Sequence, residues 1–166
     1  ARFYTFYGNG LGAPAAIGEA GVGRVLAVAE WHPNVGTPAS DGFYQAFRQR
    51  FPRPQDDYVH VRMHVMVDLL AAAIERAQNT QAAPVARALE GLSVQGAAWQ
   101  GVHQGTMRAA DHQFIQPLIV SEMQRSGTPG TRFDNEGSGY GFRSVLTLAP
   151  AETELPHTCT MERPLP

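Results

Sequence analysis

The stretch that decides the fold is residues 3–31, FYTFYGNGLGAPAAIGEAGVGRVLAVAEW. Its first segment, residues 3–7, is dense in aromatic strand formers and ends at Gly8. Residues 13–21 are expected to form a short helix, and residues 24–31 form a continuous apolar run typical of a strand buried on both faces. A strand, a helix and a second strand in this order usually imply a parallel sheet. The opening of the chain therefore predicts an α/β fold.

The composition of the 166 residues is that of a folded domain. Hydrophobic residues make up 43% and charged residues 17%, against roughly 25% charged for an average soluble domain, which excludes a disordered chain. The net charge is -2 with no basic block, so no nucleic-acid partner is expected. The longest apolar stretch, residues 65–74, contains Asp68 and is too short to span a bilayer. The single cysteine, Cys159, cannot form an internal disulfide and leaves open a partner outside this chain.

Three helices are expected in the middle of the chain. After a Pro/Gly loop at 32–39, Ser40 or Asp41 is expected to cap the first, which ends before Pro52. The strongest helix is expected over 58–78, because apolar residues recur there at helical spacing. They are Met63, Met66, Val67, Leu70 and Ile74. Since this helix is apolar on most sides, we expect it to be central. A third helix is expected from about residue 80 to 89.

After Gly91 the sequence pattern changes from helical spacing of apolar residues to short apolar runs. Short strands are expected at 92–96, 105–108, 114–120 and 144–148. Residues 126–141 are rich in Gly, Ser, Asn and Pro and are expected to be loop. Residues 149–166 contain four prolines and are expected to form an extended tail on a surface.

The glycines of the first turn match a dinucleotide-binding pattern. Gly8, Gly10 and Ala13 follow a strand and open a helix, and Glu30 ends the next strand. Such glycines let the backbone approach a pyrophosphate, and the acid holds a ribose. The expected helix is short, however, and no further alternation of strands and helices follows. A dinucleotide-binding oxidoreductase therefore stays as the alternative function.

The remaining polar motifs do not predict catalysis or a metal site. His60 and His64 are four residues apart on the expected helix, yet no Glu lies between them and no third ligand is evident, so we expect no metal. Asp111 and His112 are adjacent in sequence, so their side chains diverge, and no nucleophile accompanies them. Asp111 is expected to bond backbone amides in a turn between strands. We expect no enzyme and no cofactor.

Taken together, several segments resemble one family. The chain is similar to the C-terminal part of a periplasmic substrate-binding protein of the branched-chain amino acid (Leu/Ile/Val) ABC transporter family. The resemblance lies in the order and spacing of segments 6–10, 25–31, 43–47, 58–77, 85–92 and 106–113. The segment DNEGSGYGFR at 134–143 is similar to one subgroup of that family. The resemblance covers nearly all of this chain, which is somewhat less than half of a typical member.

The resemblance implies a partial type I periplasmic-binding-protein fold, an α/β fold with pieces of two parallel-sheet lobes joined by hinge crossovers. Residues 1–33 would belong to the C-terminal lobe. Residues 34–115, with the long central helix, would belong to the N-terminal lobe. Residues 116–166 would return to the C-terminal lobe and end in the tail. The hinge crossings would lie near 31–34 and 114–117.

The same resemblance implies a solute-binding component of an ABC importer. It would capture an amino acid or a similar small carboxylate or amide in an interlobe cleft in the periplasm, without covalent chemistry, and deliver it to a membrane permease. By position, the contacts carried over are Tyr7, Asn9, Gly10, Arg62 and His64. Members of the family often have an acidic residue at the first turn and an aromatic residue on the long helix. Here a neutral Asn9 and a cationic Arg62 suit a carboxylate or an amide better than a small aliphatic amino acid.

The part of the fold that this chain does not cover has physical consequences. Without the early strands of the N-terminal lobe, strand edges and an apolar helix face stay uncovered. We therefore expect the chain to self-associate, as a self-assembling piece, and to bind solute weakly or not at all when alone.

Overall fold

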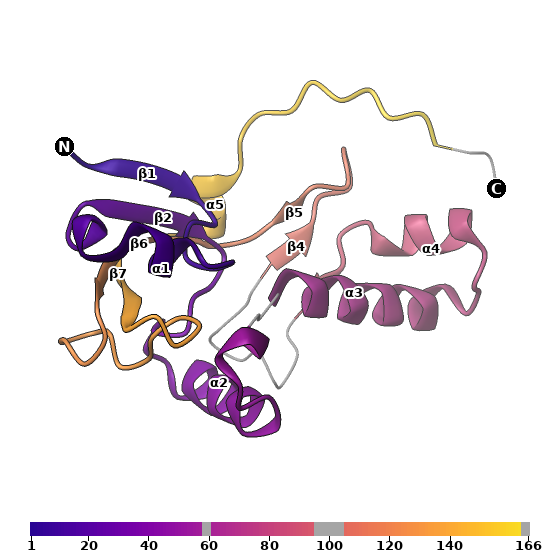
Figure 1. The fold of residues 1–166 in the computed structure, drawn as a ribbon. Coiled ribbons are helices and arrows are strands. Elements are labelled where there is room, and N and C mark those ends of the chain that lie inside the picture. Colours follow the sequence, from indigo (N-terminus) through magenta and orange to yellow (C-terminus); the bar gives the residue numbers. More distant parts are fainter. Residues whose placement is uncertain (58–60, 95–104, 164–166) are drawn as a thin grey trace. The chain divides into compact units, whose positions relative to one another are not determined.

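The computed structural model describes residues 1–57, 61–94 and 105–163. The chain forms two compact units, which are described separately here (Figure 1). Unit 1 comprises residues 1–59 and 118–148, and unit 2 comprises residues 60–117 and 149–166. The expected boundaries at 33/34 and 115/116 concern the lobes of the family fold and stay a prediction.

Unit 1 is built on a four-stranded sheet with the order β1-β2-β6-β7. Strands β1 (Phe3–Phe6) and β2 (Val25–Ala29) run parallel, so the parallel pairing predicted from residues 3–31 is confirmed. Strands β6 (Leu118–Arg125) and β7 (Tyr140–Leu148) are antiparallel to their neighbours, which makes the sheet mixed. Strand β7 begins four residues before the expected 144–148, because its first residues pair with the end of β6.

The connection between β1 and β2 packs tightly on the sheet. The helix expected over 13–21 is split into α1 (Ala13–Ile17) and the 3-10 turn η1 (Gly18–Gly21), because Gly18 takes a φ of 58° that ends the α-helix. A Cβ on Gly21 would lie 2.6 Å from the sulfur of Met123, so the close approach requires glycine. Underneath lies the core of unit 1, made of Val25, Ala27, Met123 and Phe142.

Helix α2 (Pro38–Arg50) begins earlier than the sequence suggested. The hydroxyl of Thr37 accepts a hydrogen bond from the Ser40 N–H at 3.2 Å, and Pro38 fits the first turn. The expected cap at Ser40 or Asp41 was therefore wrong. The Ser40 hydroxyl instead accepts a hydrogen bond from Nε1 of Trp31 at 2.9 Å in the buried interior. A short 3-10 turn, η2 (Pro54–Asp56), follows the helix.

In unit 2, helix α3 (Val61–Ala77) packs against α4 (Ala82–Leu89). The buried positions of α3 are Val61, Val65, Leu69 and Ala73. Most of the predicted stripe is uncovered, because Met63, Met66 and Val67 are each more than half exposed. Only Ile74 of the stripe packs against the core that α3 shares with α4. The expectation of a central helix was therefore wrong for the described residues. A helix that is apolar on two faces does not reveal which face its neighbour covers.

A small antiparallel sheet completes unit 2, with β3 (Ser93–Val94), β4 (Gly105–Met107) and β5 (Phe114–Ile115). The strand expected over 114–120 is divided into β5 and β6 at Pro117, which has no N–H to donate to a sheet. Residues 95 and 96 of the expected strand 92–96 lie outside the described residues.

The expected tail at 149–166 contains a helix that the sequence reading missed, α5 (Pro150–Thr153). The Glu152 carboxylate accepts a hydrogen bond from the Ala149 N–H at 2.8 Å, and the Thr153 hydroxyl donates to the Gln116 carbonyl at 2.7 Å. Beyond α5 the described residues follow an irregular path to Arg163.

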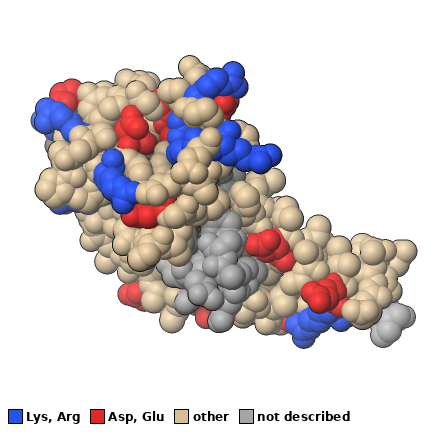
Figure 2. All heavy atoms as spheres, turned by 90° about the horizontal axis from the view of Figure 1, so that it is seen from below, with Lys and Arg blue, Asp and Glu red and all other residues tan. Residues whose placement is uncertain are grey.

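Among the described helices, none combines the length and the hydropathy needed to cross a bilayer. Basic and acidic side chains are interspersed on the face shown in Figure 2. Arg53 pairs with Asp56 at 2.7 Å, and Arg132 pairs with Asp41 at 2.9 Å.

Candidate functional site

Three of the predicted site residues lie in one turn that follows β1. Tyr7 has a φ of 58° and donates its N–H to the Val28 carbonyl at 3.3 Å. The side-chain amide of Asn9 donates to the Trp31 carbonyl at 3.3 Å. A Cβ on Gly10 would have no atom within 4 Å, so the backbone is accessible there. The end of β1 therefore presents a turn whose backbone is accessible to a small molecule.

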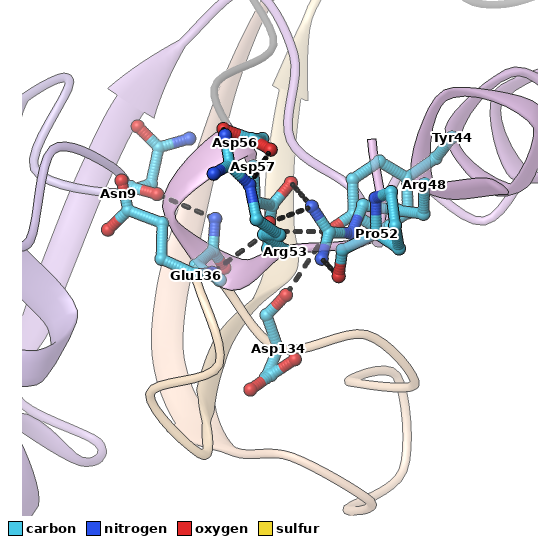
Figure 3. Close-up of polar contacts among 10 residues, drawn as sticks. Asn9, Tyr44, Arg48, Pro52, Arg53, Asp56, Asp57, Asp134 and Glu136 are labelled. Carbon is cyan, nitrogen blue, oxygen red and sulfur yellow. Dashed lines mark hydrogen bonds and ion pairs between the residues drawn. The ribbon is translucent and has the colours of Figure 1, made fainter. Parts of the chain in front are cut away.

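The shape of this turn is held by the loop between β6 and β7. Nδ2 of Asn135 donates to the Asn9 carbonyl at 2.7 Å. The Glu136 carboxylate accepts the Gly12 N–H at 2.6 Å. Figure 3 shows Glu136 directly beside Asn9. The turn after β1 is thus held in its conformation by residues that follow it by more than 120 positions.

The loop is in turn anchored by Asp57 and Tyr44. One Asp57 oxygen, Oδ2, accepts both the Glu136 N–H at 2.8 Å and the Tyr44 hydroxyl at 2.7 Å. Burial and the hydrogen bond to Asp57 raise the pKa of Tyr44, so its hydroxyl stays a donor. Arg48 lies 3.9 Å from the other Asp57 oxygen and donates to the backbone carbonyls of residues 52 and 53 (Figure 3).

A second tie connects the same loop to the end of β2. The side-chain amide of Asn34 makes two hydrogen bonds to the backbone of Phe133. Its Nδ2 donates to the Phe133 carbonyl at 2.8 Å, and its Oδ1 accepts the Phe133 N–H at 2.7 Å. Nδ1 of His32 accepts the Asn34 N–H at 3.2 Å, so its proton lies on Nε2, which donates to the Ser144 hydroxyl at 2.8 Å. Burial lowers the pKa of His32 to about 4, and the ring is neutral at pH 7.

Oδ1 of Asn135 and Oγ1 of Thr131 are buried and have no hydrogen-bond partner within the described residues. Most buried polar atoms in proteins are bonded, so each such atom calls for an explanation. Asn135 belongs to the amide that contacts the turn, and Thr131 lies elsewhere in the loop, beside Gly141.

The other two predicted site residues, Arg62 and His64, lie in the first turn of α3 and are exposed. Tyr7, Asn9 and Gly10 stand in one turn of unit 1, whereas Arg62 and His64 stand two positions apart on α3 of unit 2, a spacing at which side chains do not face each other. His60 lies outside the described residues. In the part of the chain that is described, no three His, Cys, Asp or Glu side chains gather as metal ligands.

The alternative of a dinucleotide site is not supported. Where that motif would bring a pyrophosphate to the backbone, the Gly12 N–H is bonded to the Glu136 carboxylate, whose charge would repel an anion. Strand β2 also pairs with an antiparallel strand on its other side, whereas the dinucleotide fold continues with parallel strands.

In unit 2, the turn between β4 and β5 is structural. Oδ1 of Asp111 accepts the Gln113 N–H at 3.1 Å, which confirms the predicted role of Asp111. Arg108 makes a two-pronged ion pair with Asp111, at 2.9 and 2.6 Å, and this hydrogen bonding lowers the pKa of Asp111 to about 2. The same guanidinium donates to the Leu155 carbonyl at 2.8 Å and so ties down the segment after α5.

Sequence reasoning missed Asp57, Asn135 and Glu136 as parts of the site. The two loop residues stand in a Gly- and Ser-rich stretch that predicts only a loop, and Asp57 stands outside every motif, just before the helix expected over 58–78. The one available signal was the resemblance of 134–143 to a family subgroup.

Comparison with known proteins gives a family match. A family model described as "Periplasmic binding protein" matches residues 1–128. No curated protein sequence matches the chain. A similar solved structure is the leucine-, isoleucine-, valine-, threonine- and alanine-binding protein from Brucella ovis in a closed conformation, with 22% identity and a TM-score of 0.78. That match covers 99% of this chain and 41% of the Brucella protein.

Two structures from Rhodopseudomonas palustris are similar at a TM-score of 0.60. One is a solute-binding protein of an ABC transporter in complex with 3,4-dihydroxybenzoic acid, with 12% identity over 80% of this chain and 32% of its own. The other is an ABC-type branched-chain amino acid transporter, with 17% identity over 93% of this chain and 38% of its own. The likeness to these structures shows the fold, and this chain spans less than half of each.

Proposed function

This chain belongs to the periplasmic binding protein family, and on that basis we propose that it forms part of the solute-binding component of an ABC importer. The family consists of solute-binding proteins and not of enzymes. This chain has the partial type I fold that was expected from its sequence. Binding, without turnover, is the function that we assign to this chain.

The observation that supports this proposal is the turn after β1. Its backbone is accessible at Gly10, and its conformation is set in advance by Asn135 and Glu136. A binding turn that is ordered before the solute arrives loses little conformational entropy on binding. We propose that Tyr7, Asn9 and Gly10 contact the solute, and that Arg62 and His64 of unit 2 do so as well.

The proposed solute class follows from the named relatives. The Brucella protein is a leucine-, isoleucine-, valine-, threonine- and alanine-binding protein, and one Rhodopseudomonas protein holds 3,4-dihydroxybenzoic acid. Both kinds of solute carry a carboxylate, for which the guanidinium of Arg62 is a suitable partner. We propose a small carboxylic acid, with the amino acids as its leading members.

The proposed partner is a membrane permease of the ABC class, and the proposed location is the periplasm, as the family implies. Delivery to a permease requires release, so moderate affinity suits this role. The chain spans 41% of the Brucella protein, and part of the contact surface is therefore outside it. We expect this chain alone to bind solute weakly, with a Kd on the order of 1 mM.

Weak binding is best tested by NMR titration of the isotope-labelled chain. The probes are L-leucine, L-alanine, 3,4-dihydroxybenzoate and NAD. Binding of an acid should shift the backbone amides of residues 7–12, and Asn9→Ala should weaken it about tenfold by removing the bond to Trp31. The matched control is Asn79→Ala in unit 2. If NAD shifts these amides and none of the three acids does, the solute-binding function is rejected.

We also propose that the isolated chain self-associates. Strand β1 lies at the edge of its sheet, and Phe3, Tyr4 and Phe6 are 62%, 69% and 77% exposed. An uncharged aromatic edge strand is a template for pairing with another strand. Light scattering should find a dimer or larger species, and Phe6→Lys should shift it toward monomer. A monodisperse monomer at high concentration would contradict this proposal.

A further inference from the structure

The turn after β1 contains a chemically labile peptide bond. Asparagine is one of the thermolabile residues. It reacts most readily when glycine follows it, because glycine has no Cβ to restrict the backbone around the following nitrogen. The chain has four asparagines, and Asn9 is the only one that glycine follows. The sequence therefore singles out the bond between Asn9 and Gly10, and the surrounding contacts decide whether its atoms can react.

The backbone nitrogen of Gly10 is open to reaction. Its N–H has no hydrogen-bond acceptor among the described residues. A Cβ placed on Gly10 would meet no atom within 4 Å, so the backbone is not crowded at this point. A hydrogen-bonded N–H resists loss of its proton, and a crowded peptide group cannot rotate. The Gly10 nitrogen can therefore lose its proton and move toward the Asn9 side chain.

The loop between β6 and β7 activates the same peptide group. Nδ2 of Asn135 donates a hydrogen bond of 2.7 Å to the Asn9 carbonyl (Figure 3). When the Gly10 nitrogen loses its proton, the negative charge is shared with this carbonyl oxygen, because both atoms belong to one conjugated peptide group. A donor that is already in place stabilises such a charge as it develops. The tertiary structure therefore favours the reactive form of Gly10.

The side-chain amide of Asn9 is held less firmly than those of the other asparagines. Among the described residues it makes one hydrogen bond, to the Trp31 carbonyl at 3.3 Å, which is longer than the usual distance of about 3 Å. Asn34 is bonded through both amide atoms, at 2.8 and 2.7 Å. Asn79 accepts a backbone N–H at 2.8 Å, and Asn135 is only 7% exposed. The structure thus leaves Asn9 as the most reactive of the four.

We propose that Asn9 is a site of spontaneous covalent modification. The Gly10 nitrogen loses its proton and attacks Cγ of Asn9, and the new C–N bond closes a five-membered succinimide ring. The bond from Cγ to Nδ2 breaks, and the side-chain nitrogen takes up the proton and leaves as ammonia. Water then opens the ring at either carbonyl and gives aspartate or isoaspartate. A neutral amide is replaced by a carboxylate, with water as the only co-reactant.

The modification changes the turn that we propose to contact solute. Aspartate at position 9 has no donor for the Trp31 carbonyl. Its negative charge also lies near the Glu136 carboxylate, which is bonded to the Gly12 N–H of the same turn. Both changes should loosen the turn. The reaction itself needs no solute, so this inference goes beyond the proposed function and stands or fails separately from it.

The test is incubation of the folded chain at mildly alkaline pH, followed by digestion with trypsin and mass spectrometry. The chain has no lysine, so cleavage occurs at arginine, and residues 3–24 form a peptide whose only side-chain amide is Asn9. Deamidation adds about 1 Da to this peptide. Peptides 77–87 and 133–143, with Asn79 and Asn135, are internal controls. Peptide 3–24 should be modified roughly tenfold or more faster than either control.

The matched variant is Gly10→Ala. Gly10 has no left-handed φ and its Cβ position is open, so alanine fits, while its side chain hinders the attack. Modification of peptide 3–24 should slow roughly tenfold or more. Gly42→Ala, at another open position, should leave the rate unchanged. If peptide 3–24 is modified no faster than peptide 77–87, or if Gly10→Ala reacts at the original rate, the proposal is wrong. Should Gly10→Ala not fold, the comparison of the three peptides from the unaltered chain decides.

Discussion

Unit 1 and unit 2 are stabilised by polar contacts of different reach. In unit 1, Asn34, Asn135 and Glu136 bond to groups 99 to 126 residues away in sequence. In unit 2, Asn79 bonds to a group two residues away, and the ion pair of Arg108 with Asp111 spans three. The difference teaches that the proposed binding turn depends on the folding of all of unit 1. The turns at Asn79 and Asp111 of unit 2 are instead bonded within two or three residues, and longer bonds such as that of Arg108 to the Leu155 carbonyl join its segments.

The largest expected effect comes from the core of unit 1. Phe142 is fully buried against Met123, so Phe142→Ala should lower the free energy of unfolding by about 3–5 kcal/mol. Hydrogen exchange should show lost protection in β2, β6 and β7 and a smaller change in α3 and α4. Phe51→Ala, at a position 39% exposed, is the control and should cost about 1 kcal/mol. Equal loss of protection in both units would show that they unfold as one.

Acid should destabilise unit 1 through His32. Its pKa is about 4 in the folded chain and 6.5 when unfolded, so the unfolded chain binds more protons between these values. The full contribution of His32 to the free energy of unfolding is present above pH 6.5. The free energy of unfolding should fall by about 3 kcal/mol as the pH decreases to 4. Denaturant titrations across this range provide the measurement. His32→Gln, which can still donate and accept, should flatten this dependence, and an unaltered slope in the variant would assign it to other groups.

Two asparagine variants compare a contact between residues far apart in sequence with a contact between near neighbours. Asn34→Ala removes two hydrogen bonds to Phe133 and should cost about 2 kcal/mol. Asn79→Ala removes one exposed bond to the Gln81 N–H before α4 and should cost about 0.5–1 kcal/mol. Thermal unfolding of the two variants measures the difference. If Asn79→Ala proved the more costly, the contrast drawn between the units would be reversed.

The smallest effect is expected at Arg108. Arg108→Gln removes the bond to the Leu155 carbonyl, the pairing with Glu154 at 3.5 Å and the two-pronged ion pair with Asp111. Amides of residues 108–113 and 150–156 should exchange faster, and the unfolding midpoint should fall by less than it does in Asn79→Ala. Arg24→Gln on the exposed surface of unit 1 is the control. A tail that exchanges at its original rate would mean that Arg108 does not hold it.

Much of the fold could be predicted from local patterns. The parallel pair β1–β2, the helices α2, α3 and α4, and the loop between β6 and β7 stand close to their expected positions. The prediction failed where the pattern of one segment was compatible with two structures. The apolar residues of α3 occupy two faces, and only tertiary packing decides that the face of Val65, Leu69 and Ala73 is the buried one. Likewise, Pro117 divides a run that reads as a single strand.

By itself, the sequence determined that a glycine-rich turn bearing Tyr7, Asn9 and Gly10 follows a strand, and that its segments match one family. These properties depend on backbone preferences and side-chain order over a few residues. Only the tertiary structure decided that Asn135 and Glu136 reach this turn, because β6 and β7 must first pair in one register for the loop between them to arrive there. Charge near a turn is set by distance in space, and sequence separation carries no information about it.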